Sequence, residues 1–549
     1  MCDDGNIQNQ DFRVPPQHGQ LLLHPAADQF GALIQDNIIA RESWHAVTVS
    51  GRGWLELIEE ARQELVHLAR DYSRRWRSDD SLPATEGNRA IVLSGHQPNL
   101  VHPGVWFKNF LISSLAESHN AIAINLLIDN DTSDGSSIKV PALADQSSQL
   151  VSVPIEQLDQ DLPYEEWHVQ DQQHFTSFAE RVGEAGSEWL DQPLLPGLWK
   201  DIVQGLEETQ NVGQLLSRGR YRLEAELGLK TLELPLSEIC RSDLFRLFTA
   251  MLIEQAEHFQ EIHNSSLAQY RETHRIRSRS HPFPDLVQEE SWWEIPFWLW
   301  TADNPKRRRA FARVEKDGII IGDRASTQFS LPGLPARHEQ DLLAAFERAE
   351  QEGIRVRPRA LVTTMYIRLV LGDTFVHGVG GARYDQLTDV IIERFFGLPA
   401  PHYIVASATL LLPLSLPPVS DQHVDQARQQ LRDSEFSPDV FLSALLEDNQ
   451  VSDETQIGLI RSLIESKQQH VRQQISPADR PAWHQQLQAI NQQLSSYADP
   501  FRDSLREQLA ELVRQHAQKA ALSSREFSFC LFPAETLFSQ LLEFVGKAP

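Results

Sequence analysis

Cysteines and long apolar runs are scarce in this sequence, and their scarcity excludes two classes of protein. The 549 residues include only Cys2, Cys240 and Cys530, with no Cys-x-x-Cys pair. Cysteines so few and so far apart do not form the disulfide framework of a small secreted protein. No run approaches the roughly 18 apolar residues of a membrane-spanning helix, and the first residues lack the basic and apolar regions of a signal peptide. We therefore expect a cytoplasmic protein with no membrane partner.

Positive charge is also in deficit. The chain has 50 Lys and Arg against 76 Asp and Glu, a net charge of −26. Such a chain repels a polyanion unless a local basic patch overrides the average, so we expect no nucleic-acid partner and a small-molecule substrate instead. The apolar fraction of 41% is sufficient for packed cores. At roughly 100–200 residues per domain, the length predicts three or four domains.

The clearest local pattern is a strand, a helix and a second strand between residues 91 and 131. Residues 91–95 form an apolar run that leads into a turn with two histidines, and a helix-length segment follows. A second apolar run, at residues 122–128, ends in Asp129, Asn130 and Asp131. In open parallel sheets ligands bind at the carboxyl ends of the strands, so we expect the site at these two strand exits.

The remaining sequence divides into segments of different character. Residues 54–70 have the spacing of an amphipathic helix, and strand patterns return near residues 374 and 403. Residues 310–314 and 319–321 flank a turn and predict a hairpin. We predict a Rossmann-like parallel sheet formed by residues 1–149 and 346–419, with an inserted connective lobe at 150–345, an antiparallel coiled-coil hairpin at 420–525 and a C-terminal tail at 526–549 that packs on the core.

These segments, in this order, resemble the family of bacillithiol-biosynthesis cysteine-adding enzymes, which are cysteine ligases. Ser94-Gly-His-Gln-Pro98, followed by Gly104, is similar to the family's Ser-Gly-Gln-Gln-Ala stretch and the glycine near it. Asp129-Asn-Asp131 stands where the family has Gly-Glu-Asp-His-Asp. Asn130 therefore replaces a glutamate of the family, and Thr132 replaces its histidine.

Two further places carry the resemblance. Residues 357–366 lead, at the family's distance, into the turn at 375–380, where the family has a Gly-Gly-Pro-Gly-Glu sequence. In that turn His377 replaces a glycine and Gly381 replaces the glutamate. Leu531-Phe-Pro533 resembles a Leu-Phe-Pro near the family's C-terminus. The resemblance implies an α/β fold with a Rossmann-like core and a C-terminal antiparallel coiled coil, and a ligase activity.

His96 and His102 lie in the turn after the first strand and are candidate catalytic residues. In class I nucleotidyl transferases a His-x-Gly-His turn donates hydrogen bonds to phosphate oxygens and stabilises developing charge. Here His102-Pro-Gly104-Val105 retains the first histidine and the glycine but has valine in place of the second histidine. Gly104 and Lys108 are candidate anion- or nucleotide-binding residues at the start of the helix. Alternatively, the two histidines only cap the turn and bond to nearby carbonyl groups.

The acids after the second strand are the next candidates. Asp131 is a candidate catalytic residue that positions or deprotonates the nucleophile. Asp129 and Asn130 are candidate substrate-binding residues, together with Gln97 and Asn99 of the preceding turn. A calcium loop is excluded, because no glutamate stands at its twelfth position and the helix-loop-helix frame is missing. Alternatively, the acids belong to an ordinary solvated loop with an Asx turn.

The turn after the third predicted strand has three glycines that could expose backbone amides to an anion. Gly378, Gly380 and Gly381 are the candidate anion-binding residues, and tight packing is the alternative reason for glycines there. His377, Tyr384 and Asp385 are candidate substrate-binding residues. If the strands that begin near residues 91 and 374 are neighbours, these groups converge with His96, His102 and Asp131 on one pocket.

The expected function is therefore a ligase or transferase that joins an amino acid or similar small nucleophile to a sugar- or amine-bearing acceptor. ATP with Mg²⁺ is the candidate cofactor, no protein-bound metal site is expected, and the coiled coil would form a homodimer. A catalytically inactive nucleotide- or metabolite-binding protein of the same fold is the alternative. The tryptophans of residues 292–300 and Arg307–Arg309 would suit a nucleic-acid enzyme, but a lobe core with a charged face agrees better with the net charge.

Overall fold

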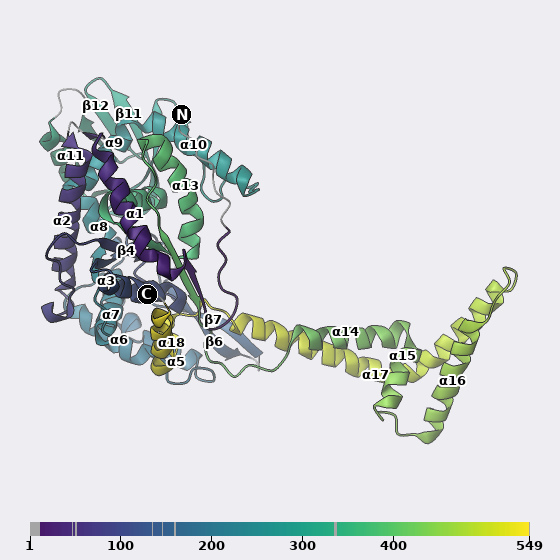
Figure 1. Ribbon diagram of the computed structural model, residues 1–549. Helices are drawn as coiled ribbons and strands as arrows, with labels where there is room; N and C mark the ends of the chain where they lie inside the picture. The colour runs from purple at the N-terminus through teal and green to yellow at the C-terminus, as the bar shows by residue number, and fades with distance from the viewer. Residues whose placement is uncertain are drawn as a thin grey trace. The chain divides into compact units, whose positions relative to one another are not determined.

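The computed structural model describes residues 11–46, 48–49, 52–133, 136–144, 147–158, 161–333 and 338–547, and Cys2 lies outside them. The chain separates into two compact units. Unit 1 comprises residues 1–140, 151–413 and 525–549. Unit 2 comprises residues 141–150 and 414–524. Figure 1 draws the helices and strands of both units.

Unit 1 is built on a mostly parallel core sheet. Within the described residues its strand order is β1-β16-β15-β4-β5-β8, and only the β1–β16 pair is antiparallel. The strands are β1 (Gln20–His24), β4 (Ile91–His96), β5 (Ile122–Leu127), β8 (Leu232–Pro235), β15 (Thr374–His377) and β16 (Ile404–Thr409). The four strands predicted near residues 91, 122, 374 and 403 thus share one sheet, as expected.

Side-chain alternation explains how this sheet is buried. Ile91 and Leu93 of β4, and Ile122 and Ile124 of β5, contribute to one large apolar cluster on one face of the sheet. Helix α2 (Trp54–Ser73) packs against β8 and contributes its apolar stripe to the same cluster. Helix α3 (Pro103–Ser118) packs against β4, β5 and β16, and α13 (Val379–Phe396) packs against β15 and β16.

A second, antiparallel sheet of unit 1 has the order β13-β12-β11-β10-β14, with β9 beside β10. Its strands are β9 (Gln288–Glu289), β10 (Trp292–Thr301), β11 (Asn304–Glu315), β12 (Gly318–Gly322), β13 (Gln328–Pro332) and β14 (Ile354–Pro358). The hairpin predicted around residues 310–321 is confirmed, since β11 pairs with β12 from Phe311 opposite Gly322 to Glu315 opposite Gly318. Helices α10 (Ala256–Thr273) and α11 (Glu339–Gln351) pack on this sheet.

Further hairpins and helices lie outside these two sheets. They are the hairpins β2 (Thr48–Val49)–β3 (Arg52–Gly53) and β6 (Ser137–Ala144)–β7 (Ser147–Pro154), and the helices α1 (Phe30–Glu42), α4 (Gln172–Thr176), α5 (Phe178–Ala185), α6 (Leu195–Gln204), α7 (Val212–Glu226), α8 (Leu236–Arg241), α9 (Asp243–Glu254), α12 (Ala360–Tyr366) and α18 (Ala534–Gly546). Helix α18, in the C-terminal segment, packs on α3.

One strand of the core sheet comes from a segment that the sequence assigned elsewhere. Residues 150–345 were expected to form an inserted lobe, yet β8 lies within this range and is an edge strand of the core sheet. Its sequence, Leu-Glu-Leu-Pro, does not look like a core strand because it contains a glutamate. Glu233 is buried there because it forms an ion pair with Arg220 and accepts a hydrogen bond from Asn125. Charge in the middle of a short strand removes the apolar run on which the sequence prediction depended.

Unit 2 contains four helices in residues 414–524, where the sequence predicted two long ones. They are α14 (Asp421–Phe436), α15 (Pro438–Glu447), α16 (Glu454–Arg472) and α17 (Arg480–Leu522). Helices α14, α15 and α16 each contact α17. A small apolar core with Phe441, Ile460 and Leu494 joins α15, α16 and α17. The first predicted helix is broken at Pro438, which starts α15, and again before Asp453, which caps α16.

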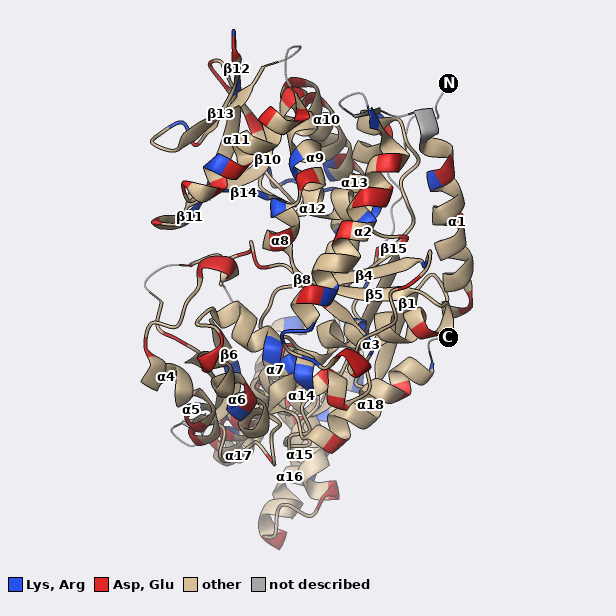
Figure 2. Cartoon of the chain, turned by 90° about the vertical axis from the view of Figure 1, so that its left-hand side faces the viewer, with Lys and Arg blue, Asp and Glu red and all other residues tan. Residues whose placement is uncertain are grey.

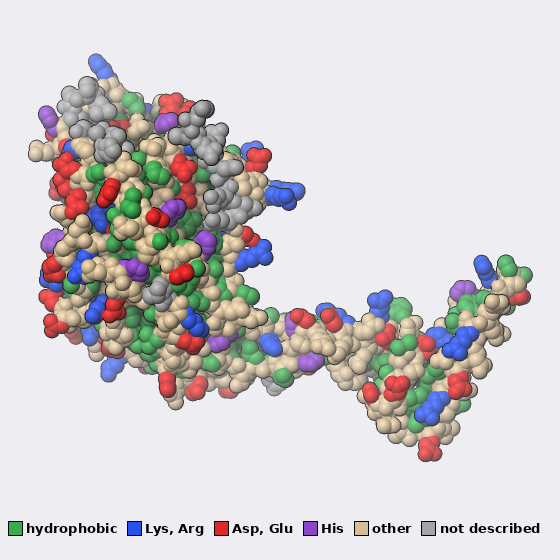
Figure 3. All heavy atoms as spheres, viewed as in Figure 1, with side chains coloured by type: hydrophobic (Ala, Val, Ile, Leu, Met, Phe, Trp, Pro, Cys, Tyr) green, Lys and Arg blue, Asp and Glu red, His purple; other side chains and the backbone are tan. Residues whose placement is uncertain are grey.

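The surface carries both signs of charge. On the face drawn in Figure 3, acidic and basic side chains are interspersed. Arg308 and Arg309, which had suggested a nucleic-acid surface, form ion pairs with Asp323 and Glu294. Among the described residues, no helix is both long and apolar enough to cross a membrane.

Candidate functional site

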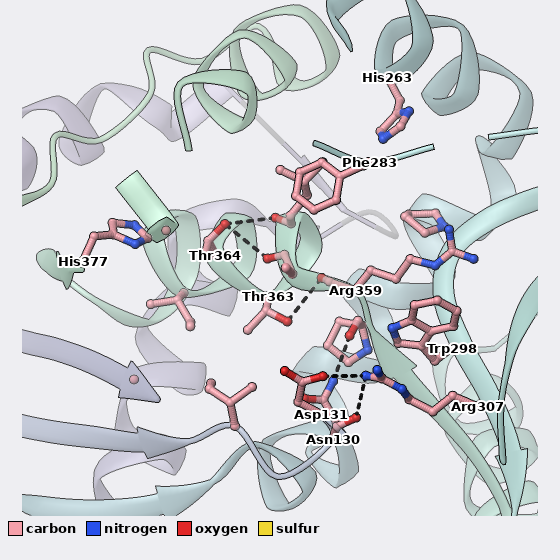
Figure 4. Close-up of a pocket in the computed structure, with 18 of the residues that line it drawn as sticks. Asn130, Asp131, His263, Phe283, Trp298, Arg307, Arg359, Thr363, Thr364 and His377 are labelled. Carbon is pink, nitrogen blue, oxygen red and sulfur yellow. Dashed lines mark hydrogen bonds and ion pairs between the residues drawn. The ribbon is translucent and has the colours of Figure 1, made fainter. Parts of the chain in front are cut away.

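A cavity of about 410 Å³ lies where the carboxyl ends of the core strands meet the antiparallel sheet. Gly95 of β4, Ile128, Asn130 and Asp131 after β5, and His377 of β15 contribute the core-sheet side of its lining. The opposite side comes from β10, β11 and the start of α12. Figure 4 shows this arrangement, with His377 and Asp131 from the core sheet and Trp298 and Arg307 from the other sheet. The site is thus at the edge of the parallel sheet where ligands usually bind.

Most of the cavity wall is apolar or aromatic. The apolar lining residues are Ile128, Phe283, Pro284, Leu286, Pro296, Trp298, Pro358, Ala360, Leu361, Ile367 and Phe375. A few polar groups project between them, including His263, Thr363 and Thr364. Apolar walls with a small number of placed polar groups are typical of small-molecule sites, and the volume lies in their usual range.

His377 is held by a carboxylate at the exit of β15. Its Nε2 lies 2.7 Å from Oδ2 of Asp385, which comes from α13, two turns of helix further along the chain. Asp385 also accepts hydrogen bonds from Thr364 (2.7 Å) and Arg368 (2.8 Å). Burial alone would raise the pKa of Asp385, but its contacts with His377 and Arg368 outweigh burial and hold that pKa below its ordinary range.

The glycines after His377 have different roles. A Cβ atom built on Gly381 would lie 2.7 Å from Nδ1 of His377, so glycine is required there for the imidazole to fit. Cβ atoms on Gly378 and Gly380 would meet nothing within 4 Å. Only Gly381 of the three lines the cavity among the described residues. Of the three predicted anion-binding glycines, Gly381 is the one that lies at the cavity, where it makes room for the ring of His377.

Three hydrogen-bond donors hold the Asp131 carboxylate, and one of them is the backbone nitrogen of Thr132 (2.9 Å). Its Oδ1 accepts a hydrogen bond from Arg307 (2.9 Å), and its Oδ2 accepts one from Gln97 (2.6 Å). Arg307 also donates to the backbone oxygen of Asn130, whose side-chain amide donates to the oxygen of Pro358 (2.8 Å). The predicted residues Gln97, Asn130 and Asp131 are thus brought together, and they connect the core sheet to β11 and β14.

Two arginines flank Trp298 on the far side of the cavity. The guanidinium carbon of Arg359 lies 4.4 Å from the indole centroid and that of Arg307 lies 5.0 Å from it. Arg359 donates from Nη2 to Glu294 (2.8 Å), but its buried Nε has no hydrogen-bond partner in the part of the chain that is described. Burial lowers the pKa of Arg359, and the charge of Glu294 opposes that shift. Arg307 and Arg359 both line the cavity and give this side a positive charge that suits an anion.

The turn after β4 is packed rather than open. His96 is buried, and its Nδ1 donates to the oxygen of Gln97 (2.8 Å). His102 caps α3, since its Nδ1 accepts a hydrogen bond from the nitrogen of Gly104 (3.1 Å). Burial, together with repulsion from Arg525 and Lys108, lowers the pKa of His102 to about 3, so the ring is neutral at pH 7. Neither histidine lines the cavity, and the predicted convergence with Asp131 does not occur for them.

The other residues predicted around this turn are also structural. A Cβ atom on Gly104 would lie 2.2 Å from the carbonyl oxygen of Ala408, so this glycine admits a close approach of backbone rather than of a phosphate. Lys108 is buried, donates to the oxygen of Gly95 (2.7 Å), and has a pKa lowered by burial to about 8. The side-chain oxygen of Asn99 is buried without a hydrogen-bond partner among the described residues.

Asp129 and Tyr384 support the cavity from outside it. Asp129 accepts hydrogen bonds from the nitrogen and the hydroxyl group of Ser237 at the start of α8. Burial, and repulsion from Glu165, raise the pKa of Asp129 to about 7. Tyr384 packs its ring against Phe283, which lines the cavity, at a centroid distance of 5.2 Å.

The sequence predicted ATP with Mg²⁺ as a cofactor, but the carboxylates of Asp129 and Asp131 are not arranged to bind Mg²⁺. Asp129 accepts hydrogen bonds from Ser237, and Asp131 accepts them from Arg307 and Gln97. Neither carboxylate is therefore free to coordinate a metal ion. Among the described residues, no group of three or more His, Cys, Asp or Glu side chains is arranged to hold a metal ion. No step of the chemistry proposed below involves a metal.

The sequence did not single out His263, Trp298, Arg307 or Arg359 as site residues. Arg359 follows β14, a strand of the antiparallel sheet, so the rule for the carboxyl ends of parallel strands does not select it. Trp298 and Arg307 looked like core and surface residues because they belong to the antiparallel sheet. No protein-family model matches this chain, and a comparison with curated proteins found no match either.

Proposed function

We propose that the protein is an enzyme of the cysteine-adding ligase type, which joins an amino acid or similar small molecule to a sugar- or amine-bearing acceptor. The family resemblance supplies the reaction class. The observation that carries the proposal is the His377–Asp385 pair, which faces a cavity whose far wall holds Arg359 and Trp298.

The chemistry assigned to the chain is proton transfer and substrate orientation. When an amine attacks an activated carboxyl group, the new C–N bond forms, the bond to the leaving group breaks, and the nitrogen loses a proton. His377 would accept this proton, because Asp385 orients the ring and stabilises its protonated form. Arg359 would bind an acidic group of the substrate, while Trp298 and Phe283 would contact its apolar part. Asp131 would hold Arg307 in place rather than act as a base.

The experiment is a binding and product screen with amino acids, nucleotides and glucosaminyl compounds. Ligand binding is followed by calorimetry, and a joined product is sought by mass spectrometry. In Arg359→Gln the affinity for an acidic ligand should fall about 10- to 100-fold, the cost of losing one charge-assisted hydrogen bond. Arg308→Gln is the matched control, because Arg308 pairs with Asp323 and does not line the cavity. Equal affinity in Arg359→Gln and the wild type would contradict the proposal.

A binding protein without catalysis is the second candidate, and the position of His102 favours it. His102 is the histidine of the His-x-Gly-His pattern that the chain retains. It caps a helix and does not line the cavity. Ligand binding without any joined product, under conditions that saturate the cavity with both substrates, would select this candidate.

We also propose that unit 2 mediates formation of a homodimer, because long helical hairpins typically serve as dimerisation elements. Helix α14 packs against α17, which is 43 residues long. Light scattering on the full chain and on a chain without residues 420–524 tests this assignment. Two copies are expected for the first chain and one for the second.

A further inference from the structure

A second cavity lies at the amino-terminal edge of the core sheet, opposite to the edge that carries the first. Ile91, the first residue of β4, and Ile122, the first residue of β5, both line it. Its volume is about 520 Å³. The rest of its lining comes from one side of α2 and from the loop at residues 85–89.

Helix α2 is built to present polar groups on this side. Its apolar residues, including Leu57, Ile58, Ala61 and Leu65, belong to the buried cluster of unit 1. The residues that face the cavity follow the three- and four-residue spacing of another helix face. They are Glu59, Arg62, Gln63, Val66, His67 and Arg70. Figure 2 shows the acidic and basic bands along α2.

Positive charge predominates in this cavity, in a chain whose net charge is −26. Arg62, Arg70 and Arg89 line it together with one acid, Glu59. Arg62 is buried and shares the carboxylate of Asp373 with a second arginine, at distances of 2.7 Å and 2.6 Å. That second residue, Arg41, lines an adjoining cavity of about 220 Å³ that Arg62 and Arg89 also border. The adjoining cavity is also lined by Glu42, Glu59 and Asp373, so the excess of positive charge lies in the second cavity, where three arginines face one acid.

Several N–H groups of these arginines have no acceptor. Arg70 donates from Nη1 to the hydroxyl of Thr85 (2.7 Å), but its buried Nε has no partner among the described residues. Arg89 donates only from Nε, to the oxygen of Glu86 (3.0 Å), in the part of the chain that is described. Arg70 and Arg89 are half-buried. Guanidinium groups with unused donors bind oxyanions, and phosphate matches their planar geometry.

We propose that this second cavity is a binding site for a small organic phosphate. Its phosphoryl group is bound by Arg62, Arg70 and Arg89. Glu59 accepts a hydrogen bond from a hydroxyl or amino group on the remainder of the ligand, since a carboxylate can only accept. The two cavities share no lining residue, so this site is independent of the function proposed for the first.

The test is a titration of the full chain with inorganic phosphate, pyrophosphate and glucose 6-phosphate, followed by ³¹P NMR and calorimetry. Ionic strength is held constant with chloride. Arg89→Ala is the informative variant, because Arg89 forms no ion pair in the described structure and its removal should not impair folding. Arg428→Ala, on the exposed surface of α14, removes the same charge elsewhere. Melting curves establish that both variants are folded.

The expected result is saturable binding of at least one phosphate compound, weakened about tenfold or more in Arg89→Ala and unchanged in Arg428→Ala. Three results overturn the proposal. They are no binding of any of the three probes, equal binding in Arg89→Ala and wild type, or equal weakening in the two variants, which would reflect net charge alone.

Discussion

Two turns of the core sheet begin with a histidine at the carboxyl end of a strand and continue through glycine into a helix. After β4, His96 and His102 are packed and Gly104 lies against the backbone of Ala408. After β15, His377 faces a cavity and Gly381 makes room for its ring. The same local sequence pattern thus serves helix capping in one turn and a candidate site in the other.

The C-terminal segment accounts for the difference. The nitrogen of Phe529 donates to the oxygen of Val101, and the Phe529 ring packs on Trp106 at a centroid distance of 4.4 Å. Arg525 donates to the hydroxyl of Ser407 beside the same turn. The β4 turn is therefore covered by residues more than 400 positions away in the sequence. The local sequence pattern places a histidine at the end of a strand. Residues far away in the sequence determine whether that histidine is accessible to a ligand.

Substitutions in the two turns are expected to differ most in their effect on turnover. His377→Ala should reduce the rate of an identified reaction about 10²–10⁴-fold, the usual contribution of a positioned general base. His102→Ala should lower stability by about 1 kcal/mol through loss of the helix cap, and leave turnover per folded molecule unchanged. Steady-state kinetics and melting curves on both variants give the comparison. A larger loss of turnover in His102→Ala would restore the β4 turn as the catalytic site.

The glycines extend the comparison to stability. Gly104→Ala should lower the free energy of unfolding by about 1–3 kcal/mol, because a carbonyl oxygen occupies the place of the new methyl group. Gly378→Ala, in the β15 turn, should cost less than about 1 kcal/mol, since open space surrounds the site of its Cβ atom. Urea unfolding measures both. Similar losses in the two variants would mean that the turns are packed alike.

Asp129, at the exit of the strand next to β4, should make stability depend on pH. Its pKa is about 7 in the folded chain and 3.8 ordinarily, so the folded state binds the proton more tightly. The associated stabilisation is complete below about pH 4 and is lost as the pH rises through 7. Its size is on the order of 2–4 kcal/mol. Asp129→Asn should remove this loss in unfolding measurements between pH 5 and pH 8; an unchanged slope would assign it to another group.

Gln97 gives the smallest effect, because it is the member of the β4 turn that reaches the site. It donates to Asp131, which in turn holds Arg307. Loss of this hydrogen bond in Gln97→Ala should weaken ligand binding about fivefold, from roughly 1 kcal/mol. Calorimetry with the ligand found for the wild type measures the change. An affinity equal to that of the wild type would place the whole β4 turn outside the site.

Sequence patterns predicted the parts of the fold that depend on local apolar runs. The parallel strands β4, β5, β15 and β16 were all predicted. The position of Asn130, Asp131 and His377 at one edge of the sheet was predicted as well. Strand β8 was missed because an ion pair neutralises its buried glutamate. Arg307 and Trp298 were missed as site residues because tertiary packing of a second sheet brings them to the cavity.

The most direct test of this account is a crystal structure of the chain with the ligand identified in the binding screen. The account predicts that the ligand lies in the cavity between His377 and Arg359, with an acidic group on the guanidinium and its reacting atom near the imidazole. A ligand bound instead at the β4 turn, in contact with His96 or His102, would contradict it.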